Sequence, residues 1–132
     1  MALSLAPLLN ASPAIQLHTA AACVAAVSGV YVMLRAKGTA SHRASGYAFS
    51  IAMLLTAITS FGITSLSPGH YSWIHILSAI TLVSIPLAIY YRRTGNIRKH
   101  AANMIGPFAG LIIAGAFTFA PGRIMYQVIF GP

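Results

Sequence analysis

Four histidines recur at a nearly constant spacing, and they are the residues best able to do chemistry in this sequence. His18 and His75 are 57 positions apart (75 minus 18), and His42 and His100 are 58 apart (100 minus 42). Each histidine stands near the start of an apolar run of about helix length, and a basic turn follows the first run and the third. We interpret the sequence as two tandem copies of one helix–loop–helix unit.

The four histidines indicate a haem protein. Haem iron takes two axial ligands on opposite faces of the ring, and an imidazole nitrogen is a common one. Consecutive spans alternate in direction, so His18 and His75 would lie near one membrane face and His42 and His100 near the other. We therefore predict one or two haem b groups, with His18–His75 and His42–His100 as the axial ligand pairs.

The charged residues favour the same chemistry. There are eight Lys or Arg residues and no Asp or Glu, so paired-carboxylate hydrolysis and carboxylate-bridged di-iron sites are excluded. Haem propionates would supply the missing anions, and Arg43, Arg98 and Lys99 stand beside His42 and His100 to bind them. The single cysteine excludes an intramolecular disulfide.

Two other functions remain open. A histidine in a membrane span is often a hydrogen-bonding link between helices, and in that case the chain would be a cofactor-free accessory subunit of a larger membrane complex. A third reading is a haem or metal transporter. The first hypothesis is an electron carrier across the bilayer, an oxidoreductase component of a respiratory chain, with a quinone as candidate redox partner and a homodimer as a further candidate assembly.

The composition predicts which elements position the histidines. Of 132 residues, 58% are hydrophobic and 6% are charged, and the mean hydropathy is +0.79, whereas about a quarter of a soluble domain is charged. We predict one all-α integral membrane domain over residues 1–132, a four-transmembrane-helix bundle of two helix-hairpin repeats. The expected spans are about 14–36, 40–65, 72–91 and 97–119, with an extended interfacial tail over 1–13 and an amphipathic interfacial tail over 121–132.

The cations also predict orientation. Seven of the eight flank the first and third turns, and Arg123 is the exception. The positive-inside rule then gives cytoplasmic turns and two non-cytoplasmic termini, in a membrane that we expect to be the bacterial inner membrane. Cations between apolar runs favour anionic lipids over nucleic acid as partners.

Three segments resemble one known family. Lys37-Gly38-Thr39, Gly95-Asn96-Ile97-Arg98-Lys99-His100 and Pro121-Gly122-Arg123 resemble the family of small bacterial membrane proteins known as domain of unknown function 2306, from about His18 to the C-terminus. That resemblance implies a membrane location and little about activity. The histidine layout is also similar to the cytochrome b-561 type, in which four helices hold two haems near opposite faces, although the spacing from His18 to His42 is shorter here.

Overall fold

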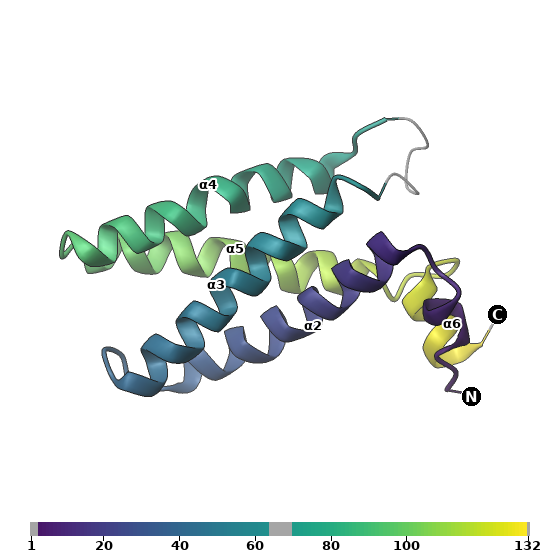
Figure 1. Ribbon diagram of the computed structural model, residues 1–132, viewed down its shortest axis with the longest axis horizontal. Coiled ribbons are helices and arrows are strands. Elements are labelled where there is room, and N and C mark those ends of the chain that lie inside the picture. The colour runs from purple at the N-terminus through teal and green to yellow at the C-terminus, as the bar shows by residue number, and fades with distance from the viewer. Residues whose placement is uncertain (1–2, 64–69, 132) are drawn as a thin grey trace.

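The computed structural model describes residues 3–63 and 70–131, which form helices and no strand, so the all-α prediction is confirmed for these residues. Figure 1 shows the elements in chain order. They are α1 (Ala6–Leu9), α2 (Pro13–Leu34), α3 (Ala40–Ser60), α4 (Trp73–Arg93), α5 (Ile97–Phe117) and α6 (Ile124–Phe130).

Two tight turns fold α2–α3 and α4–α5 into hairpins. Gly38 and Gly95 adopt φ of +82° and +81°, a left-handed conformation that glycine reaches without a steric penalty. Thr39 and Asn96 then cap the next helix, because each side-chain oxygen accepts the backbone N–H three residues later, at 3.2 and 3.1 Å. The two turns are therefore built alike.

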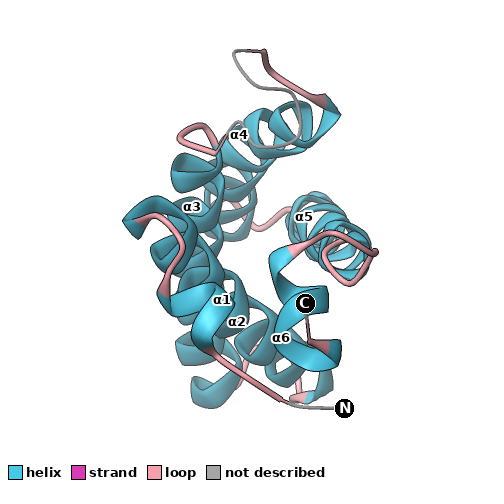
Figure 2. Cartoon of the chain, turned by 90° about the vertical axis from the view of Figure 1, so that its right-hand side faces the viewer, coloured by secondary structure: helices cyan, strands magenta, loops and turns pink. Residues whose placement is uncertain are grey.

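Helix α3 is the central element. It packs against α2 on one side and α4 on the other, and its Phe49 and Met53 join Ala25 and Ile85 in the buried core. Helix α5 packs mainly on α4, and Pro107 is its one buried residue in the described chain. In the view of Figure 2, the α5 ribbon lies to the right of α2 and α3, and its Phe108 and Leu111 pack against the core.

Three of the described helices are long and apolar enough to cross a membrane, namely α2, α4 and α5. Helix α3 has the same length as α4 and α5, 21 residues, but it is not among them. It begins with Ser41-His42-Arg43 and carries several hydroxyl residues further on. Neighbours cover α3 on two sides, so it can hold more polar residues than a helix that faces lipid. The four-span prediction is thus supported for three helices.

The predicted span boundaries need correction by a few residues. The first two helices end earlier than expected, at Leu34 and Ser60 rather than near 36 and 65, and residues 64–69 lie outside the described part. After Ser60 the backbone hydrogen bonds span three residues instead of four. For example, the Phe61 N–H donates to the Ile58 carbonyl at 3.3 Å. Helix α4 instead runs on to Arg93, because cations stabilise a helix C-terminus. Helix α5 ends at Phe117 rather than near 119.

The two tails meet at one end of the molecule. The prediction of an extended segment over residues 1–13 is wrong, because α1 forms there with Pro7 in its first turn, where proline's missing N–H costs nothing. The Ser4 N–H donates to the Val128 carbonyl at 2.9 Å, and α1 packs against α6. Both termini therefore lie at the end opposite the two hairpin turns (Figure 1).

Candidate functional site

A cavity of about 610 Å³ opens between the turn ends of the two hairpins. His42 of α3 and His100 of α5 both line it. Four cations also line this cavity, which we call the cationic cavity: Lys37, Arg43, Arg92 and Arg93. Phe49, Ile89 and Met104 supply apolar walls. Its size lies within the range of about 300–1,000 Å³ typical of small-molecule sites.

Each of these two histidines is oriented by a carbonyl of the preceding helix. The Nδ1–H of His100 donates to the Ala88 carbonyl at 2.9 Å, and the Nδ1–H of His42 donates to the Val32 carbonyl at 3.3 Å. A histidine that binds a metal usually donates its other ring N–H to such an acceptor, and this hydrogen bond fixes the tautomer. Nε2 is then left with a lone pair on both rings.

His18 is held in the same manner but at the other end of the hairpins. Its Nδ1–H donates to the Thr56 carbonyl at 2.9 Å, and the Thr59 hydroxyl oxygen lies 3.1 Å from the same nitrogen. His18 lines a second cavity of about 570 Å³, which we call the apolar cavity and which α2, α3, α4 and α5 enclose together. The wall of this cavity does not include His75.

His75 has the opposite hydrogen-bonding pattern. The Ser72 backbone N–H donates to His75 Nδ1 at 2.9 Å, so the ring proton is on Nε2. That nitrogen is buried and has no hydrogen-bond partner within the described residues. The His75 ring packs against Tyr71 and Phe61, with centroid distances of 4.9 and 5.7 Å. With a proton on Nε2, this ring has no lone pair for a metal.

The start of each helix explains why His18 and His75 differ despite the sequence repeat. Helix α2 begins at Pro13, which puts His18 in its second turn. Helix α4 begins at Trp73, so His75 is the third helical residue and reaches back to the N-cap at Ser72. Glutamate or glutamine normally fills that capping role. The repeat therefore holds in sequence at this end but not in local structure.

The three cations predicted to bind propionates do not all reach the cationic cavity. Arg43 lines it, whereas Lys99 places its Nζ 5.1 Å from the centroid of the Tyr91 ring and Arg98 is exposed. Lys37, Arg92 and Arg93 line it and were not predicted as site residues. The order of helices along the sequence could have indicated these three residues. A tight hairpin turn places the residues at the end of one helix beside the residues at the start of the next.

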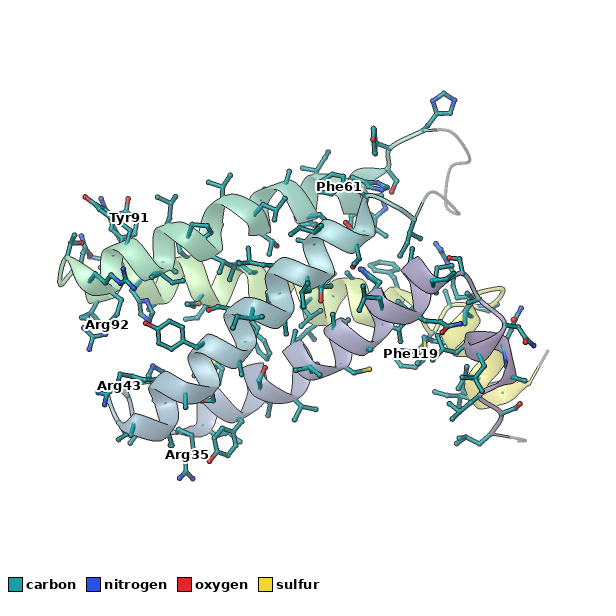
Figure 3. All side chains as sticks on the ribbon, viewed as in Figure 1. Arg35, Arg43, Phe61, Tyr91, Arg92 and Phe119 are labelled. Carbon is teal, nitrogen blue, oxygen red and sulfur yellow. The ribbon has the colours of Figure 1, made fainter. Side chains whose placement is uncertain are left out.

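The charges around His42 converge. Lys37 and Arg92 both lie within electrostatic range of the His42 ring. Figure 3 shows Arg43 and Arg92 at the same end of the molecule, from α3 and α4. Because the sequence contains no Asp or Glu, no side-chain carboxylate neutralises them. The cationic cavity therefore suits an anionic ligand.

The ligand set suits haem better than a bare metal ion. Within residues 3–63 and 70–131, no three His, Cys, Asp or Glu side chains come close enough together to hold a metal ion. A bound zinc ion takes three or four protein ligands. A haem iron already has four porphyrin nitrogens and asks the protein for one or two axial ligands, and the cationic cavity offers two imidazoles.

A family model described as predicted membrane protein (DUF2306) matches residues 15–131. No curated protein and no solved structure matches the chain. The matched range includes the four histidines and all eight lysine and arginine residues.

Proposed function

Because the chain belongs to the predicted membrane protein family domain of unknown function 2306, we propose that it is a membrane-embedded haem b protein that carries electrons. In this proposal, His42 and His100 would hold the haem iron. The observation that supports it is that both rings line one cavity with Nδ1 bonded to a carbonyl. Bound there, haem would supply a one-electron redox centre.

The surrounding residues have separate roles in this proposal. Arg43, Arg92 and Arg93 would bind the propionates through charge-assisted hydrogen bonds. Phe49, Ile89 and Met104 line the same cavity and would cover the apolar part of the porphyrin. Lys37 is partly committed elsewhere, because its Nζ donates to the Val32 and Met33 carbonyls at 3.1 and 2.9 Å.

The outer ligand pair, His18 and His75, remains a prediction with weaker support. To bind iron through Nε2, His75 would have to give up the bond from the Ser72 N–H and move its ring proton to Nδ1. Its ring would also have to leave the contacts with Phe61 and Tyr71. We therefore propose one haem per chain, in the cationic cavity.

The alternative of a cofactor-free accessory subunit also has a specific observation in its favour. His18 and His42 bond α2 to α3, and His100 bonds α5 to α4, so each imidazole stabilises a hairpin without any ligand.

An optical spectrum separates these two functions. The full chain, purified in mild detergent from haem-sufficient cells, should show the sharp reduced bands of a six-coordinate, low-spin haem b after dithionite is added. Two strong-field nitrogens leave no open position on the iron, so carbon monoxide should leave the reduced spectrum unchanged. A colourless preparation would favour the accessory subunit.

The topology of the chain can be tested separately. We propose that α3 also crosses the bilayer, because it packs against both α2 and α4, two helices that are long and apolar enough to cross. A reporter fused after Pro132 should then read as non-cytoplasmic, and a cysteine at Thr94, in a Cys23→Ala background, should react with impermeant reagents only from the cytoplasmic side. Opposite locations for Thr39 and Thr94 would mean that α3 does not cross.

A further inference from the structure

The apolar cavity is unlike the cationic cavity in its chemistry. Its walls come from all four long helices, and no lysine or arginine of the described chain lines it. Most lining side chains are aliphatic or small, including Ala22, Leu77 and Leu111. Its occupant should therefore be neutral and lipid-soluble, since a charged headgroup would be buried without a counterion.

Three threonine hydroxyls in this wall already donate to carbonyls of their own helices, and each can still accept a hydrogen bond. Thr56 donates its hydroxyl proton to the Ala52 carbonyl at 2.8 Å, and Thr81 donates to the Leu77 carbonyl at 2.9 Å. Thr118 donates to the Gly115 carbonyl at 2.7 Å. Each oxygen keeps only lone pairs for a ligand.

His18 adds the strongest acceptor. Its Nδ1–H is bonded to the Thr56 carbonyl, so in the neutral ring Nε2 carries a lone pair. The ring is half-buried, and no hydrogen bond within the described residues uses Nε2. A ligand that carries a hydroxyl can therefore donate a hydrogen bond to His18 Nε2.

We infer that the apolar cavity is a binding site for a lipid-soluble hydroquinone, with one ring hydroxyl donating to His18 Nε2. The choice of a hydroquinone among hydroxyl donors rests on the proposed electron-carrier function, because a hydroquinone is redox-active and a simple lipid alcohol is not. The oxidised quinone has carbonyl oxygens only. It cannot donate to His18 Nε2, so this one hydrogen bond distinguishes the reduced form from the oxidised form.

The probes for a test are tetramethylhydroquinone, its quinone and its dimethyl ether. Isothermal titration calorimetry on the full chain in lipid nanodiscs, under nitrogen, should give tighter binding of the hydroquinone than of either other compound. The expected difference is about fivefold to tenfold, since one hydrogen bond contributes roughly 1 kcal/mol. His18→Leu should remove this preference, and His70→Leu, a change at an exposed residue, should retain it.

A second variant guards against misfolding of His18→Leu. Ala22→Leu keeps the bond from His18 to Thr56 and fills part of the cavity, so it should block all three compounds while thermal melting shows a folded chain. Equal affinity for hydroquinone and quinone, unchanged binding by Ala22→Leu, or equally tight binding of 1-dodecanol would overturn the inference.

Different experimental results would refute the haem proposal and the hydroquinone inference. In a His100→Ala chain, which is expected to lack haem, the hydroquinone should still bind, because the cationic cavity lies at the other end of the hairpins. If the wild-type chain lacks haem yet prefers the hydroquinone, only the haem proposal is wrong. If His18→Leu lowers the haem content, the apolar cavity belongs to haem and the hydroquinone inference is wrong.

Discussion

His100→Ala should abolish the low-spin haem b spectrum, and His42→Ala should do the same. Removing a residue that merely orients a ligand already costs about 10- to 100-fold in affinity at a metal site, and each of these changes removes a ligand itself. Haem per chain, measured by the pyridine haemochrome method after detergent washing, should therefore fall at least tenfold. Any haem that stayed bound through the one remaining histidine would give a five-coordinate, high-spin spectrum.

His70→Ala and His75→Ala serve as matched controls for this prediction. His70 is exposed, and His75 spends Nδ1 on the Ser72 N–H and lies outside the wall of the cationic cavity. Both variants should keep the full haem content. Full haem content in the His42 and His100 variants would remove the basis of the proposal. Loss of half the haem in the His75 variant would instead support the second, outer haem that the sequence predicts.

Gly29→Ala should destabilise the fold by about 1–3 kcal/mol, the usual cost of adding a methyl group to a packed core. A Cβ at Gly29 would lie 2.6 Å from Cδ2 of Phe108 and 3.1 Å from Cδ2 of Phe49. The Phe49 and Phe108 rings pack edge to face with a centroid distance of 6.1 Å. Because Phe108 is on α5, moving its ring disturbs the contact between the two hairpins.

Gly46→Ala is the matched control for Gly29→Ala. The nearest atom to its Cβ would be Cγ2 of Val32, at 3.8 Å, an ordinary contact. Alanine is favoured over glycine in a helix by roughly 1 kcal/mol, so this variant should be neutral or more stable. Thermal melting in detergent compares the two directly. A Gly29→Ala chain that melts with or above the wild type would mean that α5 does not pack on Gly29.

The sequence alone determined the helical architecture, the hairpins and their turns. Apolar runs of membrane length separated by glycine-containing turns leave few other folds, and Gly38, Gly95, Thr39 and Asn96 mark those turns by local conformational preference. It also predicted that His42 and His100 lie at the same end of the molecule, because each begins the second helix of its hairpin, and both line one cavity there. The absence of carboxylates, and the anionic partner that it favours, are properties of composition.

Tertiary structure decided what each histidine can do. His18 and His75 are equivalent in spacing, but the Ser72 N-cap of α4 turns the His75 ring toward its own backbone, while the Thr56 carbonyl of α3 fixes the His18 ring. Spacing along a chain cannot report a tautomer, because the tautomer depends on which group lies beside the other ring nitrogen. The same holds for the cations. The sequence gives the number of cations. Which of them line a cavity depends on how the ends of α2 and α4 pack beside the starts of α3 and α5.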